Sequence, residues 1–256
     1  MRDRKTHTRK TAKTGGFRLH DDRTQPQRRI PGYPNTITRT PTRPFWPRLV
    51  SLADVTGPVF APESVLPEEA DLSRAAPHAP RALGQLITVS GRVLDERSRP
   101  VRQCLIEMWH ANSSGKYIHH NDPSPVPVDP NYRGCGRAVT DDAGRFSFRT
   151  IKPGGYAVPD AEAGAATGWW RPPHIHFSLF GPSFGSRLIS QWFFPGEPLN
   201  PLDLILNSIP DKAARDRLVM RFVPRTTSNS AEGDAAIGYT QDFVLRGPFE
   251  TPFENR

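Results

Sequence analysis

Short runs of alternating apolar and polar residues, separated by turn-forming residues, dominate the chain from residue 86 onward. Alternation with period two is typical of strands that bury one face. It predicts strands over residues 86–93, 104–109, 145–149, 174–180, 188–194 and 239–245. Gly, Pro, Asn and Asp gather between them, with a long loop at 112–136, and short helices are expected only at 201–208 and 211–218. The pattern predicts an all-β fold, an antiparallel β-sandwich with long loops and one or two short helices.

The first third of the chain has a different pattern. Prolines between residues 29 and 84 are too frequent for long regular elements. We therefore expect residues 29–84 to form an extended, proline-rich N-terminal arm that packs on the body or on a partner subunit. Residues 1–28 are expected to be a basic, disordered tail, and residues 85–256 to be the β-sandwich domain.

The composition limits the cellular setting. The chain has 256 residues, enough for one good hydrophobic core. It contains no apolar run long enough for a transmembrane helix, and no apolar segment follows the basic start as a secretory signal would require. Two cysteines do not make a disulfide framework. These features predict a cytoplasmic protein without a membrane span.

The net charge of +8 is unevenly distributed. Residues 1–48 contain 13 Lys and Arg but only three acidic residues, so the other 208 residues contain 21 basic and 23 acidic residues. The basic character therefore belongs to the tail. Such a tail can contact nucleic acid, but a disordered or partner-wrapping arm is the simpler interpretation, since no nucleic-acid-binding motif accompanies it.

The candidate chemistry begins at two histidines that lie two residues apart, His174 and His176. Successive side chains of a strand point to opposite faces, so both imidazoles are expected on the same face. Tyr156 follows Pro-Gly-Gly shortly before them, and Tyr117 lies further upstream. Phenolate oxygens favour hard ions, so two histidines and two tyrosines together would suit iron(III). Alone, the histidine pair fits a structural role equally well.

The order of motifs resembles the intradiol ring-cleaving dioxygenases. The residues that carry the resemblance are Val89-Ser90-Gly91-Arg92-Val93, Ile106-Glu107-Met108-Trp109, Gly115-Lys116-Tyr117, Thr140-Asp141, Ile151-Lys152-Pro153-Gly154-Gly155-Tyr156 and Arg171-Pro172-Pro173-His174-Ile175-His176. The resemblance covers roughly residues 85–247. Within the family, the chain is most similar to the iron-bearing β-type subunits that act on protocatechuate (3,4-dihydroxybenzoate).

The resemblance implies a set of site residues. The non-haem Fe(III) ligands would be Tyr117, Tyr156, His174 and His176, with Tyr156 as the axial ligand that leaves when substrate binds. Arg171 would lie over the substrate ring, and Gln191 would help to orient the substrate. Tyr33 would bind near the axial ligand and the substrate. Ala157 and Val158 depart from the family, in which an aromatic residue shapes the pocket, and this leaves the ring substituent open.

The implied function is cleavage of protocatechuate with O2 to 3-carboxy-cis,cis-muconate. The implied partners are the catecholic substrate, O2 and an α subunit in a hetero-oligomer. Two alternatives remain: a homo-oligomeric catechol or hydroxyquinol 1,2-dioxygenase, and a non-catalytic β-sandwich binding subunit. Elsewhere, His110 at a strand end is expected to make a structural hydrogen bond, and Cys104 in an apolar strand is expected in the core.

Overall fold

The computed structural model describes residues 22–33, 40, 43, 62–120, 122, 124–159, 166–181, 188–226 and 235–253. Most of the predicted tail and a large part of the arm therefore lie outside the described residues. The proposed boundary between arm and body stays a prediction. None of the described helices is long and apolar enough to span a membrane.

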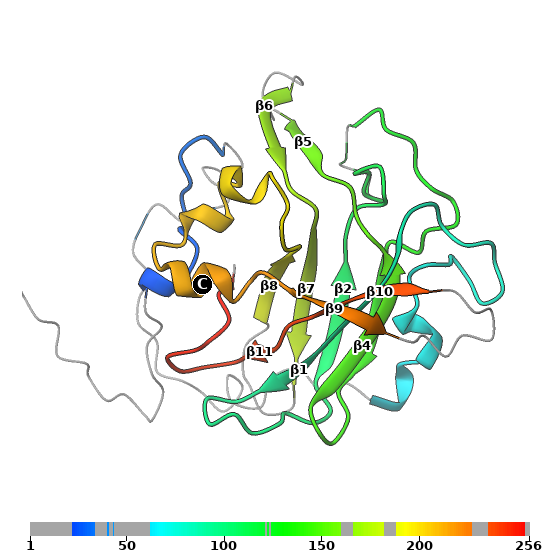
Figure 1. The fold of residues 1–256 in the computed structure, drawn as a ribbon, viewed down its shortest axis with the longest axis horizontal. Coiled ribbons are helices and arrows are strands. Elements are labelled where there is room, and N and C mark those ends of the chain that lie inside the picture. Colours follow the sequence, from blue (N-terminus) through cyan, green and yellow to red (C-terminus); the bar gives the residue numbers. More distant parts are fainter. Residues whose placement is uncertain are drawn as a thin grey trace, which may run out of the picture.

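Two β-sheets form the body (Figure 1). The first sheet contains β1 (Leu86–Leu94), β4 (Arg145–Ile151), β9 (Arg221–Thr226), β10 (Ala236–Thr240) and β11 (Phe243–Val244). The second contains, in spatial order, β3 (Cys135–Val139), β2 (Leu105–Trp109), β7 (His174–Phe180) and β8 (Leu188–Phe193). A separate two-stranded hairpin, β5 (Tyr156–Pro159) and β6 (Ala166–Arg171), projects from one end of the sandwich (Figure 1).

The predicted sandwich is confirmed, and most strand pairs are antiparallel. The central strand β1 adds a detail that the pattern does not predict, since it pairs in parallel with β10 and then with β11 along one edge. Between these two pairings, the segment that connects β10 to β11 passes against Gly91 of β1. A Cβ atom at Gly91 would lie 1.8 Å from the carbonyl oxygen of Gln241, so only glycine permits this crossing.

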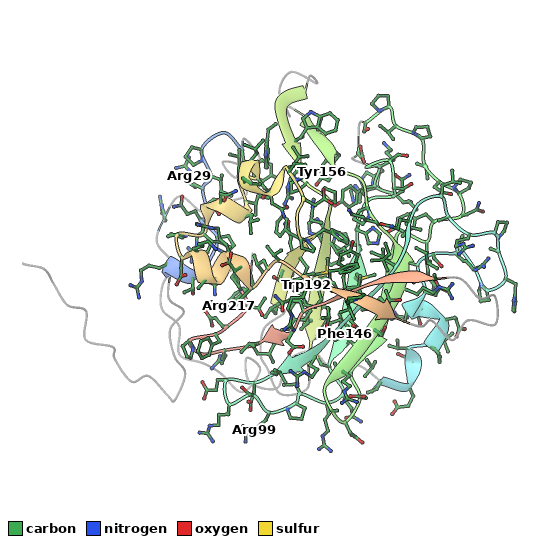
Figure 2. The ribbon with its side chains drawn as sticks, viewed as in Figure 1. Arg29, Arg99, Phe146, Tyr156, Trp192 and Arg217 are labelled. Atoms are coloured by element: carbon green, nitrogen blue, oxygen red, sulfur yellow. The ribbon has the colours of Figure 1, made fainter. Side chains whose placement is uncertain are left out.

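Aromatic side chains from both sheets fill the space between them. Trp192 is fully buried, with its ring centroid 4.3 Å from that of Phe243 and 4.5 Å from that of Phe177. Phe146 contributes from the other sheet, at 5.9 Å from Trp192. Figure 2 shows Trp192 and Phe146 in the middle of the molecule and Tyr156 toward the hairpin. Truncating such a buried aromatic costs about 3–5 kcal/mol, so this cluster holds the sheets together.

Several elements differ from the sequence pattern. Strands β3, β5, β6 and β9 are not expected from it, because they alternate weakly or lie among loop-forming residues. The predicted last strand is divided into β10 and β11. The helical region is confirmed but shorter, with 3₁₀ turns at Asn200–Leu202 and Leu206–Ser208 and one α-helix, α3 (Lys212–Asp216).

Candidate metal centre

The two histidines are held by β7 at the end near the hairpin. His174 is buried, and its Nδ1 lies 2.7 Å from the carbonyl oxygen of Pro172, which can only accept a hydrogen bond. This bond places the ring proton on Nδ1, so Nε2 carries a lone pair. The Nε2 atom of His176 lies 3.1 Å from the Nε2 atom of His174, which confirms that both imidazoles share one face of the strand. The His176 ring stacks on Trp109 of β2 at 5.1 Å.

A compact turn positions Tyr117. Asn112, which is buried, accepts hydrogen bonds at its Oδ1 from the backbone N–H groups of Ser114 and Lys116, each at 2.9 Å. Asp122 accepts from the N–H of Tyr117 at 2.9 Å, and its carboxylate also pairs with Lys116 Nζ at 3.2 Å. Sequence reasoning missed both supporting residues. Their signal is the turn-forming character of Asn and Asp close to a candidate ligand.

Glycines bring the two tyrosine-bearing segments together. A Cβ at Gly154 would lie 2.5 Å from the carbonyl oxygen of Ser113 and 2.7 Å from the nitrogen of Gly115. Gly115 has a positive φ of 82°, and a Cβ there would lie 2.4 Å from the carbonyl oxygen of Gly155. Backbone therefore packs directly against backbone. As a result the rings of Tyr117 and Tyr156 meet edge to face, with centroids 5.4 Å apart.

The side chains of Tyr117, Tyr156, His174 and His176 converge on one place. The Tyr117 Oη lies 3.5 Å from His174 Nε2 and 3.2 Å from His176 Nε2. The ring centroid of Tyr156 lies 5.7 Å from that of His174. Bonds of about 2.1 Å from nitrogen and oxygen donors to one ion, at angles of roughly 90–110°, would place donors about 3.0–3.4 Å apart. Two of the three separations, 3.1 and 3.2 Å, fall within this range and the third, 3.5 Å, lies just above it, so the three donors are spaced closely enough to share one ion.

The electrostatic setting favours neutral imidazoles. Burial, with help from the nearby charge of Arg171, lowers the pKa of His174 well below its usual range and that of His176 to about 3. Burial also raises the pKa of the Tyr117 and Tyr156 hydroxyls, and Arg171 partly opposes this rise. Neutral imidazole is the form that binds metal. Without a cation the tyrosines hold their protons, so a strongly acidic ion is needed to make them phenolates.

Arg171 lies beside this cluster and is itself buried. Its Nε donates to the carboxylate of Asp203 at 2.8 Å, and an Nη donates to Gln191 Oε1 at 2.5 Å. It is also the cross-strand neighbour of Tyr156, and its charge partly opposes the rise that burial causes in the pKa of the Tyr156 hydroxyl. Burial would lower the pKa of Arg171, but the charge and hydrogen bond of Asp203, together with the nearby Tyr156 and Tyr117 hydroxyls, more than offset this effect and raise the pKa. Sequence reasoning placed Arg171 and Gln191 together and missed Asp203, an acid within the apolar run Leu202–Leu206.

The remaining expected residues lie nearby. Tyr33 packs edge to face on Trp169 at 5.1 Å and is close enough to influence the pKa of Tyr156. Val158 is buried, and Ala157 pairs with Trp170 across the hairpin. All seven residues singled out from the sequence are therefore brought to one end of the sandwich.

His110 has the structural role expected of it. Its Nδ1 lies 2.7 Å from the Ala111 carbonyl oxygen and 2.8 Å from the Tyr132 hydroxyl, and its Nε2 lies 2.8 Å from the Thr150 hydroxyl. Burial lowers the pKa of His110 to about 4. Cys104 is likewise confirmed as a core residue.

Two further observations separate this cluster from the rest of the molecule. Within the part of the chain that the structure describes, no three His, Cys, Asp or Glu side chains gather into a possible metal site, so an ion bound at this cluster would need the tyrosine oxygens as donors. A groove of about 810 Å³ lies on the outer face of the five-stranded sheet, lined in part by Arg92, Arg145 and Arg221. It shares no residue with the tyrosine–histidine cluster.

Comparisons with known proteins agree with this geometry. A dioxygenase family model matches residues 55–247. The chain is 47% identical over 224 residues to the protocatechuate 3,4-dioxygenase beta chain of Burkholderia cepacia, covering 88% of this chain and 91% of that one. It is 29% identical over 176 residues to the protocatechuate 3,4-dioxygenase alpha chain of Pseudomonas putida, covering 68% and 78%.

A solved structure shares the fold. The 3-chlorocatechol 1,2-dioxygenase of Rhodococcus opacus superposes with a TM-score of 0.52 at 24% identity, covering 76% of this chain and 72% of that one. The family match spans most of the chain, and the relative from Burkholderia cepacia is similar over nearly its whole length. The chain therefore belongs to the intradiol dioxygenase family.

Proposed function

We propose that this chain is the iron-bearing β-type subunit of an enzyme that cleaves protocatechuate between its two hydroxyls with O2, giving 3-carboxy-cis,cis-muconate. The observation that carries the proposal is the convergence of Tyr117, His174 and His176, whose donor atoms lie 3.1–3.5 Å apart. The 47% identity to a protocatechuate 3,4-dioxygenase beta chain supports this choice of substrate.

The cofactor would be a non-haem ferric ion held by Tyr117, Tyr156, His174 and His176. Two phenolates and two neutral imidazoles suit a hard, strongly acidic ion. When bound, iron(III) would supply Lewis acidity and draw electron density from a chelated catechol. The tyrosine-rich donor set would favour the ferric over the ferrous state.

The surrounding residues would act on the substrate directly. A catechol must lose two protons to chelate, and the Tyr156 oxygen would accept one of them. Arg171 would stabilise negative charge that develops on the ring, as a preorganised donor in a site from which water is excluded. Gln191 accepts a hydrogen bond from the guanidinium at 2.5 Å and would help to orient the substrate. Tyr33 would hydrogen-bond at the edge of the pocket near Tyr156.

The assembly would be a hetero-oligomer with an α subunit of the same enzyme. The likeness to an alpha chain as well as a beta chain supports a pair of related subunits. The proline-rich N-terminal arm would wrap on that partner. A cytoplasmic location fits two cysteines that are both free.

Iron loading and visible spectroscopy test this function. Protein co-expressed with its α subunit is expected to bind one iron per chain, to show a red-brown tyrosinate-to-iron absorption band, and to consume one O2 per protocatechuate. A colourless protein with no iron would instead favour the non-catalytic binding subunit. A substrate panel on the chain with and without the α subunit separates the remaining alternative, because a homo-oligomeric enzyme would prefer catechol or hydroxyquinol.

A further inference from the structure

Arg171 and Asp203 form an ion pair that is almost entirely removed from water. The two side chains are 3% and 0% exposed, and Arg171 Nε lies 2.8 Å from Asp203 Oδ2. The other described ion pairs each have at least one partner that is 10% exposed or more. A pair so deeply buried rarely adds stability over apolar residues of the same size. Its presence beside the tyrosine–histidine cluster therefore points to a functional role.

Backbone hydrogen bonds hold Asp203 in place independently of its contact with Arg171. Its Oδ1 accepts a hydrogen bond from the backbone N–H of Leu206 at 2.7 Å, and its carbonyl oxygen accepts from the N–H of Asn207 at 3.0 Å. The 3₁₀ turns Asn200–Leu202 and Leu206–Ser208 flank it on both sides. One carboxylate oxygen is thus committed to the backbone, and the other is left to face Arg171.

Gln191 completes the enclosure of the guanidinium. It extends from β8 and pairs across the sheet with His176 of β7, so its position follows that of a candidate ligand. Its Oε1 accepts from an Arg171 Nη at 2.5 Å, while the Asp203 carboxylate accepts from Nε. The Trp169 ring lies 5.9 Å from the guanidinium carbon. The guanidinium held on these sides belongs to the direct cross-strand neighbour of Tyr156, and its charge partly opposes the rise that burial causes in the pKa of the Tyr156 hydroxyl.

We infer that Asp203 is a positioning residue for ring cleavage, which acts by aiming the Arg171 guanidinium at the substrate ring. Among the described contacts, the Asp203 carboxylate binds the Arg171 guanidinium and the backbone N–H of Leu206, and none joins it to the four candidate ligands. A charge that stabilises a transition state must be aligned in advance, and a misplacement of about 1 Å costs on the order of 100-fold in rate. This inference rests on the proposed function and adds to it Asp203, which acts through Arg171.

The test is a pair of substitutions in the assembled, iron-loaded enzyme. Asp203→Asn keeps the shape of the side chain but removes its charge. We expect kcat for protocatechuate to fall by about 10–100-fold, with KM within about threefold and iron content and the tyrosinate band unchanged. Glu69→Gln is the matched control, since Glu69 makes a bidentate pair with Arg137 on a different face. It is expected to leave kcat unchanged.

A double-mutant cycle separates positioning from general support of the fold. If Asp203 acts through Arg171, then Asp203→Asn is expected to have almost no further effect on kcat/KM in an Arg171→Gln background. Multiplicative effects of the two substitutions would overturn the inference, as would a wild-type kcat in Asp203→Asn.

Two controls keep this test decisive. If Asp203→Asn does not fold, Asp203→Glu, which retains the charge but displaces it by a methylene group, is expected to lower kcat about 10-fold. A wild-type rate in this variant would equally overturn the inference. Absence of turnover in the wild-type enzyme would instead count against the proposed function, so the two failures are distinguishable.

Discussion

The backbone contact at Gly154 makes the candidate site sensitive to a single methyl group. In Gly154→Ala, the new Cβ would lie 2.5 Å from the Ser113 carbonyl oxygen and 2.7 Å from the Gly115 nitrogen. Real Cβ atoms essentially never approach closer than 3.0 Å, so the two segments must separate by at least about 0.5 Å. Because both contacts are backbone atoms, no side chain can rotate away to relieve them.

The expected consequences follow from that separation. The Tyr117 segment moves relative to Tyr156, and half of the displacement that costs about 100-fold gives a fall of about 10-fold in kcat/KM. Overpacking of this kind costs roughly 1–3 kcal/mol of the free energy of unfolding. Oxygen consumption measures the first effect, urea denaturation measures the second, and the tyrosinate-to-iron band is expected to shift.

A matched variant separates the site effect from generic glycine strain. Gly196 has a positive φ of 74°, and no atom lies within 4 Å of the position that a Cβ would take there, so Gly196→Ala strains the backbone without a clash. It is expected to lose about 1 kcal/mol of stability and to keep its kcat/KM. If Gly154→Ala retains wild-type kcat/KM and spectrum, or if both variants lose activity equally, the reasoning about the close contact is refuted.

Three further predictions concern the ligands and one buried histidine. Tyr156→Phe is expected to retain iron but to bind protocatechuate slowly in stopped-flow absorbance, since one proton acceptor is lost; chelation at the wild-type rate would contradict the role. His174→Ala is expected to lose iron, and unchanged iron stoichiometry would remove His174 from the ligand set. Burial lowers the pKa of His110 to about 4, below the unfolded value of about 6.5, so its contribution to stability is present above pH 6.5 and is lost as the pH falls toward 4. The part of the free energy of unfolding that depends on His110 is expected to fall by about 3 kcal/mol across this range. Denaturant titrations measure it as the difference in pH dependence between the wild type and His110→Gln, and equal pH dependence in the two proteins would show that other groups are responsible.

The sequence predicted those features that depend on local pattern. Alternation placed β1, β2, β4, β7 and β8, because each buries one face of a regular strand. The spacing of His174 and His176 sufficed to place both rings on one side, since the period of a strand is fixed by its backbone. The resemblance to a family added both tyrosines, Arg171 and Gln191, which spacing alone does not bring together.

Features that arise from distant segments could not be predicted in this way. The parallel pairing of β1 with β10 and β11 depends on where the end of the chain returns. Asp203 lies 32 residues after Arg171, and nothing in the spacing connects them. Its one signal is an acidic residue inside the apolar run Leu202–Leu206, because a carboxylate that becomes buried requires a cationic partner.

The hairpin of β5 and β6 carries both the phenol of Tyr156 and the guanidinium of Arg171. Tyr156 and Arg171 are direct cross-strand neighbours in it, whereas His174 and His176 belong to the four-stranded sheet. A tilt of this ribbon would move the phenol and the guanidinium together relative to the imidazoles, against the hydrogen bonds that Asp203 and Gln191 make with Arg171. Substitutions along its outer length, far from any bound molecule, can therefore retune affinity and turnover jointly while the capacity to retain the ion persists.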